Sequence, residues 1–122
     1  MKKIIQPVTF LILITLSFWA SAQDARESYN DGMSALNRGN FQQAINKFKE
    51  AVNLKNDYQD AWYYLGISFG YAKDYQNVVY SMSRLKAINP NYNPWMYYEA
   101  CKALTELDKL EDAENAANMF LA

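Results

Sequence analysis

The sequence has no histidine and a single cysteine, Cys101, among its 122 residues. Histidine changes its charge near neutral pH, so its absence removes the usual general base and the commonest metal ligand. Glycine and proline are scarce as well, with four and three residues, and no glycine-rich phosphate loop is present. We therefore expect a protein that is not an enzyme and that holds no metal or other cofactor.

The lone cysteine excludes an internal disulfide bond, so packing must stabilise the fold. Cys101 could join two copies of the chain through a disulfide bond, or it could fill apolar space as a buried thiol. Its place in the repeat described below favours the buried thiol.

Charged residues make up 20% of the sequence, are interspersed by sign, and leave a net charge of −1. Acidic side chains such as Asp57 and Asp60 precede or begin expected helices, where they complement the helix dipole and need no metal ion. Basic residues do not line one face with aromatic residues, which excludes a nucleic-acid partner. Aromatic residues, in contrast, are abundant at 16%, and ten of them are tyrosine.

The first 22 residues have the three-part layout of a secretory signal. Lys2 and Lys3 form a positive start, residues 8–20 are mostly apolar, and small residues follow at 20–22. The apolar run is shorter than the roughly 18 residues that a membrane-spanning helix needs, so we favour cleavage before Gln23 over a retained membrane anchor.

These features predict a signal peptide over residues 1–22 and a mature domain over residues 23–122. The mature domain would be periplasmic or secreted and would have no transmembrane span.

The mature part repeats with a period of about 34 residues. Successive slides of 34 and 35 residues carry Tyr29 onto Tyr63 and Tyr98, and they carry Gly32 onto Gly66 and Cys101. A period near 34 with helical content is typical of stacked helix pairs. Apolar residues spaced by 3.6 positions predict helices over residues 24–37, 41–54, 58–72, 75–88, 94–107 and 110–121. Asn40 with Gln43, and Asp108 with Glu111, form capping-box patterns at two of the helix starts.

At these positions the sequence resembles the tetratricopeptide (TPR) repeat family. The middle unit carries the family pattern at Trp62, Leu65, Gly66, Phe69, Val78, Met82 and Pro90. The first unit lacks the tryptophan, leucine and proline of the pattern, and the third keeps it in part. The resemblance implies an all-α, right-handed solenoid of three TPR-like repeats, over residues 25–58, 59–93 and 94–122.

The repeat explains why glycine is kept inside helices, where it costs about 1 kcal/mol relative to alanine. Gly32, Gly66 and Cys101 fall in the slot where the two helices of one unit come closest. We expect a larger side chain there to push away Ala44, Val78 or Ala113 of the facing helix. Overpacking a tight core costs about 1–3 kcal/mol, which exceeds the propensity loss.

The resemblance further implies a concave surface, lined by the first helix of each unit, that holds a peptide or a partner helix. The inward slots of the family map to Arg26, Tyr29, Met33, Leu36, Asn37, Asp60, Tyr63, Ile67, Gly70, Tyr71, Trp95, Tyr98, Lys102, Thr105 and Glu106. Tyrosine and tryptophan are favoured at binding surfaces, but these rings could equally fill the space between neighbouring helices. Some chaperone-binding members clamp a peptide carboxylate with lysines and asparagines, and that clamp is absent here.

The sequence therefore predicts an exported protein–protein interaction module, an adaptor or scaffold whose partner is a protein or peptide of the cell envelope. One alternative is a self-associating structural protein, because residues 110–122 end in the apolar run Met119, Phe120 and Leu121 with no covering helix. Such an edge would support a homodimer. A lesser alternative is glycan binding on the aromatic surface.

Overall fold

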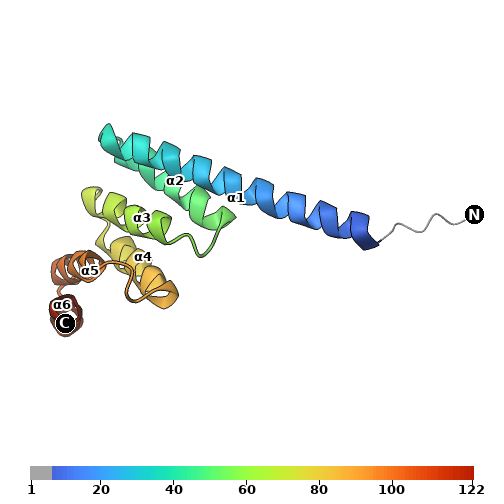
Figure 1. The fold of residues 1–122 in the computed structure, drawn as a ribbon. Coiled ribbons are helices and arrows are strands. Elements are labelled where there is room, and N and C mark those ends of the chain that lie inside the picture. Colours follow the sequence, from blue (N-terminus) through green and yellow to red (C-terminus); the bar gives the residue numbers. More distant parts are fainter. Residues whose placement is uncertain (1–6) are drawn as a thin grey trace, which may run out of the picture.

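The computed structural model describes residues 7–122, and these form six α-helices joined by short turns (Figure 1). The helices are α1 (Pro7–Asn37), α2 (Phe41–Leu54), α3 (Gln59–Tyr71), α4 (Tyr75–Ile88), α5 (Trp95–Glu106) and α6 (Leu110–Leu121). From α2 onward, every helix begins and ends within one residue of the predicted bounds. The first helix differs, because α1 begins at Pro7 and runs without a break through the predicted cleavage point.

The helices pack as three pairs that stack in chain order, from α1–α2 at the top of Figure 1 to α5–α6 at the bottom. The second helix of one pair also packs on the first helix of the next pair, so that α2 contacts α3 and α4 contacts α5. A continuous core follows these contacts and includes Phe48, Leu65, Leu85 and Met96. The predicted all-α solenoid of three helix pairs is therefore confirmed.

The turn inside each pair uses the same backbone conformation. Gly39, Lys73 and Asp108 occupy equivalent repeat positions and have φ angles of 74°, 59° and 57°. This left-handed conformation ends the preceding helix, and glycine adopts it more readily than lysine or aspartate. Asp108 lies in this turn, one residue before Lys109, which is the N-cap of α6. The predicted capping box of Asp108 with Glu111 is therefore wrong.

The residue after each left-handed turn is the N-cap of the next helix. Asn40 Oδ1 accepts a hydrogen bond from the backbone N–H of Gln43 at 3.2 Å, and Asp74 Oδ1 accepts one from Asn77 at 3.3 Å. The equivalent residue before α6 is Lys109, whose side chain makes no capping bond. The last pair therefore lacks a stabilising cap that the first two have.

Two of the three helix glycines, Gly32 and Gly66, lie tightly against side chains of the facing helix. A Cβ atom built on Gly32 would lie 2.7 Å from the ring of Phe48, and one built on Gly66 would lie 2.5 Å from Cε of Met82 and 3.3 Å from Cβ of Ser81. The neighbours that close the space are thus Phe48 and Met82, one helical turn beyond the predicted Ala44 and Val78. Ala44 and Ala113 are buried in the core.

Cys101, the third member of the slot, is only half-buried, so the expectation of a buried thiol is wrong. The residue sixteen positions after it is Ala117, whereas the same spacing leads from Gly32 to Phe48 and from Gly66 to Met82. A small facing residue leaves this site less tightly filled than the other two.

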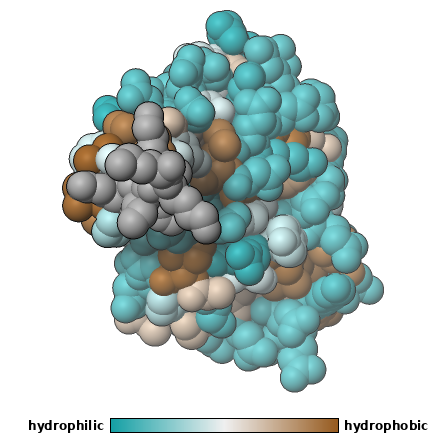
Figure 2. All heavy atoms as spheres, turned by 90° about the vertical axis from the view of Figure 1, so that its right-hand side faces the viewer, coloured by the Kyte–Doolittle hydropathy of each residue, from teal (hydrophilic) through white to brown (hydrophobic). Residues whose placement is uncertain are grey.

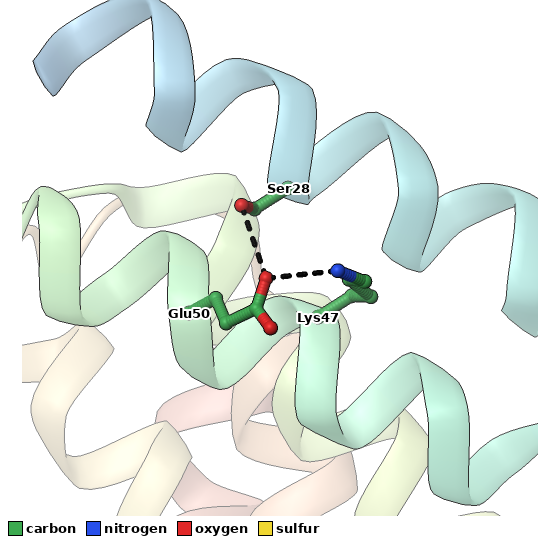
Figure 3. A network of polar contacts seen from close by, with 3 residues as sticks. All are labelled: Ser28, Lys47 and Glu50. Atoms are coloured by element: carbon green, nitrogen blue, oxygen red, sulfur yellow. Dashed lines mark hydrogen bonds and ion pairs between the residues drawn. The ribbon is translucent and has the colours of Figure 1, made fainter.

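Polar contacts join α1 to α2 on the surface of the first pair (Figure 3). Glu50 Oε2 on α2 accepts a hydrogen bond from the Ser28 hydroxyl on α1 at 3.4 Å. The same oxygen forms an ion pair with Lys47 Nζ, also on α2, at 3.1 Å. In the equivalent position of the second pair, Trp62 Nε1 donates to the carbonyl of Asn56 at 2.8 Å and so fixes the connection between pairs. The buried indole bond is the stronger constraint, because exposed ion pairs contribute little.

The N-terminal half of α1 projects beyond the repeat domain (Figure 1). Packing begins near Ser21, whose hydroxyl donates to the carbonyl of Leu54 at 3.4 Å, and Ala25 is fully buried. The exposed large apolar side chains before that point are Val8, Leu11, Ile12, Leu13, Ile14, Leu16, Phe18 and Trp19, and Figure 2 shows apolar atoms gathered around this end of the molecule. Residues 11–20 of the predicted signal region are thus separate from the core, while Lys2 and Lys3 lie outside the described residues.

Within residues 7–122, α1 is the one helix long and apolar enough to cross a membrane, judged by length and composition. Signal sequences near an N-terminus share both properties. Helix length and composition therefore do not distinguish a cleaved signal peptide from a retained anchor, and cleavage before Gln23 stays a prediction.

Candidate functional site

A cleft of about 530 Å³ opens between α3 and α5, on the surface that the first helices of the pairs share. We call it the α3–α5 cleft. It is lined by Ile67, Gly70, Tyr71, Tyr75, Val78, Glu99, Cys101, Lys102, Ala103, Thr105 and Glu106. Six of the residues that the sequence places on the concave surface are among them. The start of α4, which contributes Tyr75 and Val78, was not predicted to take part.

The apolar side of the cleft has room because Gly70 has no side chain. A Cβ atom at Gly70 would meet Val78 Cγ2 at 3.8 Å, an ordinary contact, so packing does not require glycine here. Tyr71 forms the rim and is 61% exposed, yet its ring stacks on Phe41 with centroids 4.7 Å apart and planes 6° apart. The cleft therefore combines an open apolar floor with an aromatic wall that is held in place.

The charges at the cleft are predominantly negative. Lys102 Nζ forms an ion pair with Glu99 Oε2 at 2.8 Å and lies 4.8 Å from the ring centroid of Tyr98. Glu106 is exposed and makes no ion pair within residues 7–122. The C-terminal ends of α3 and α5, with the negative ends of their dipoles, and the N-terminal end of α4, with the positive end of its dipole, all lie at the cleft.

Tyr29 and Tyr63, predicted to bind a partner, belong to a packed group of rings that we call the tyrosine cluster (Tyr29, Tyr58, Tyr63, Tyr64 and Tyr92). Tyr29 stacks on Tyr58 with ring centroids 5.2 Å apart, and Tyr63 lies 5.2 Å from Tyr64 and 5.6 Å from Tyr92. Both rings are half-buried. For these two residues the contacts favour the alternative in which the rings fill space between neighbouring helices.

The tyrosine cluster lies beside an exposed carboxylate, because the Tyr92 hydroxyl donates a hydrogen bond to Asp60 Oδ1. Burial, together with the nearby Asp60 charge, raises the pKa of Tyr29 to about 12. Burial also raises the pKa of Tyr92, followed by its hydrogen bond to Asp60, and burial raises the pKa of Tyr63. Loss of a proton from these phenols is therefore harder than from a free tyrosine, and Tyr29 joins α1 to α3 through its contact with Tyr64.

The other predicted residues lie apart from the cleft. Trp95 and Tyr98 are exposed and pack against Phe120 of α6, with ring centroids 5.3 and 5.7 Å away. Met33 is half-buried and Asn37 is exposed at the end of α1. The predicted concave set is therefore divided among the tyrosine cluster, the α3–α5 cleft and an aromatic edge at α5–α6.

Three stacked helix pairs, with a cleft between the first helices of the second and third pairs, make this protein a helical-repeat solenoid. Residues 36–70, which span the end of α1, all of α2 and most of α3, match the family model described as TPR repeat. The chain thus carries a TPR repeat and has the fold of TPR domains.

Solved structures with this fold include the second TPR of Spaghetti (RPAP3) bound to the HSP90 peptide SRMEEVD, with a TM-score of 0.79 and 14% identity over 86% of this chain and 95% of that one. The TPR domain of Arabidopsis FLU has a TM-score of 0.75 and 20% sequence identity, over 83% of this chain and 94% of that one. A chain of the CopN–Scc3 complex has a TM-score of 0.75 and 21% sequence identity, over 81% of this chain but only 58% of that chain. No curated protein matches the chain in sequence.

Proposed function

We propose that this protein is an interaction module that binds an extended peptide, or a helix, of a partner protein in the α3–α5 cleft. The observation that carries the proposal is the cleft of about 530 Å³ that Gly70 lines, beside the ring of Tyr71, which stacks on Phe41. A concave site with an apolar floor and a few placed polar groups is the usual form of a ligand site. The similarity in fold to a TPR domain that holds an HSP90 peptide supports a peptide as the ligand.

The partner we propose is a protein of the cell envelope, because residues 1–22 have the layout of a secretory signal. The separation of the apolar half of α1 from the repeat core supports this reading, since removal of the first 22 residues leaves the buried part of α1 in place. The exported domain would then act as an adaptor or scaffold.

The test is capture of partners from a cell-envelope extract with the wild type, Gly70→Leu and Tyr80→Leu. Gly70→Leu fills the cleft, whereas Tyr80 is 55% exposed on α4 and does not line it. We expect a protein that binds the wild type and Tyr80→Leu but not Gly70→Leu, with all three equally helical by circular dichroism. A partner retained by Gly70→Leu would contradict the proposal. A variant that replaces Tyr29 and Tyr63 is unsuitable, because both rings pack in the fold.

The second candidate function is self-association through α6. Both α2 and α6 are second helices of a pair. The next pair covers α2 through α3, so that Ile45 and Val52 are buried. In contrast, Leu110 and Leu121 of α6 are 63% and 78% exposed. An uncovered apolar edge of this kind marks an interaction surface or an aggregation risk. Sedimentation of the wild type and of the double variant Leu110→Glu/Leu121→Glu tests this alternative. Self-association predicts that the wild type is a dimer and that the double variant is a monomer. A wild type that stays monomeric at high concentration would contradict it.

A further inference from the structure

We propose that the α3–α5 cleft selects a cationic side chain of the bound peptide, with arginine preferred. This inference rests on the proposed function, since it names the class of ligand for the same site. Three features of the cleft carry it: its apolar floor, its uncompensated negative charge, and its aromatic wall.

The floor suits the aliphatic stem of a long side chain. Ile67 and Gly70 line the cleft with apolar surface, buried Val78 lies behind them, and a Cβ atom at Gly70 would meet no atom closer than 3.8 Å. Arginine and lysine bury a methylene stem along such a surface while their charged ends stay at the rim. A short polar side chain would leave this floor uncovered.

The rim suits a positive charge. Lys102, the one basic residue that lines the cleft, is already paired with Glu99 at 2.8 Å, while Glu106 is left without an ion pair in the described part of the chain. The C-terminal ends of α3 and α5 add partial negative charge at the same place, and the N-terminal end of α4, which also lines the cleft, offsets part of it. The excess negative charge is therefore that of Glu106. In the adjacent turn, Lys73 and Asp74 carry opposite charges, so they leave this balance unchanged.

The wall suits a guanidinium group. Tyr71 is exposed but cannot turn freely, because its ring stacks on Phe41 with an interplanar angle of 6°. A cation over the face of a fixed tyrosine gains a cation–π interaction without having to order the ring first. Guanidinium also offers a planar fork of donors to the Glu106 carboxylate, which an ammonium group does not.

The same features disfavour an acidic ligand. A carboxylate in the cleft would meet the Glu106 carboxylate, and Lys102 would have to leave Glu99 to bind it. We therefore expect a ligand preference opposite in charge to the acidic peptide SRMEEVD held by the TPR domain of Spaghetti.

The experiment is a titration of the isotopically labelled full chain, followed by amide chemical shifts, with three probes. The probes are N-acetyl-arginine amide, the uncharged analogue N-acetyl-citrulline amide, and N-acetyl-glutamate amide. We expect arginine to shift the amides of Gly70, Tyr71 and Glu106, citrulline to bind more weakly, and glutamate to leave these amides unchanged.

Two variants and a control assign the effect. Glu106→Gln should weaken arginine binding by about two- to fivefold, as expected for an exposed charge pair, and leave citrulline binding unchanged. Gly70→Leu should abolish binding of both. Glu27→Gln, an equal change of charge on α1 away from the cleft, should have no effect.

Equal binding of arginine and citrulline, or arginine shifts outside the cleft, would overturn the inference. Such a titration result refutes the cationic preference alone if, in the capture experiment, Gly70→Leu still abolishes binding of the envelope partner. The proposed function then stands. If the partner is also retained by Gly70→Leu, both fail.

Discussion

Replacement of three helix glycines by alanine tests how tightly the helix pairs are packed. Gly32, Gly66 and Gly70 all lie within helices, so each alanine gains up to about 1 kcal/mol of helix propensity. What differs is the space that the new methyl group meets. The three substitutions therefore share one favourable contribution and differ in the steric cost.

At Gly32 the methyl carbon would lie 2.7, 2.8 and 3.0 Å from three atoms of the Phe48 ring, which is fully buried and rigid. Overpacking of this kind costs about 1–3 kcal/mol, so we expect a net destabilisation of about 1 kcal/mol. At Gly66 the severe contact is with Cε of Met82, the end of a flexible side chain that can move, and we expect a change near zero. At Gly70 the nearest atom is 3.8 Å away, and we expect a stabilisation of about 0.5–1 kcal/mol.

The assay is urea unfolding of the wild type and the three variants, followed by circular dichroism at one pH. We expect the free energy of unfolding to rise in the order Gly32→Ala, Gly66→Ala, Gly70→Ala. A difference of 1 kcal/mol corresponds to a shift of about 4–8 °C in the melting temperature of a domain of this size. Equal effects at all three positions, or the reverse order, would refute the packing argument.

Three further predictions use other local features. Lys109→Asp should stabilise the protein by about 0.5–2 kcal/mol in urea unfolding, because it supplies the cap that α6 lacks, and no change would contradict the assigned helix start. Ser81→Ala should leave stability unchanged or raise it by about 1 kcal/mol, since the buried Ser81 hydroxyl has no hydrogen-bond partner within residues 7–122; a clear loss in the same assay would reveal one. Burial raises the pKa of Tyr29 from 10.0 to about 12, so the stability that its neutral phenol contributes is complete below pH 10 and is lost as the pH rises to about 12. Tyr29→Phe should reduce that loss in unfolding measured across this pH range, and an unchanged pH profile would contradict the assignment.

The helices could be predicted because two periodicities agree in this sequence. The 34-residue period fixes the units, and the 3.6-residue spacing of apolar positions fixes the helix faces. The start of α1 could not be placed this way, because no glycine or proline lies between Pro7 and Gly32 to interrupt the helix. The apolar leader therefore continues into the first repeat in one helix.

Details of the turns and of helix contacts were harder to predict. The pattern of Asp108 followed by Glu111 resembles a capping box, but the repeat itself carries Asn40 and Asp74 onto Lys109. The repeat period was the better guide, since it preserves the left-handed turn. The partners of Gly32 and Gly66 were also missed, because sequence spacing does not give the register between facing helices.

Some residues of the candidate site could be indicated from the sequence. The repeat assigns Ile67, Tyr71 and Lys102 to the concave surface, and all three line the α3–α5 cleft. It assigns Tyr29 and Tyr63 to the same surface, although these two rings pack against other rings. Whether a tyrosine packs or stays exposed depends on contacts between neighbouring units, and one unit's sequence does not contain them.

Site-specific photocrosslinking in cells tests the proposed binding site most directly. A photoreactive amino acid replaces Tyr71 at the cleft rim in one variant and Tyr80 on α4 in the other, two tyrosines with similar exposure. We predict that the Tyr71 variant crosslinks a specific protein, that the Tyr80 variant does not, and that Gly70→Leu removes the crosslink. A specific crosslink from Tyr80 alone, or one from Tyr71 that persists when the cleft is filled, would contradict binding in the α3–α5 cleft.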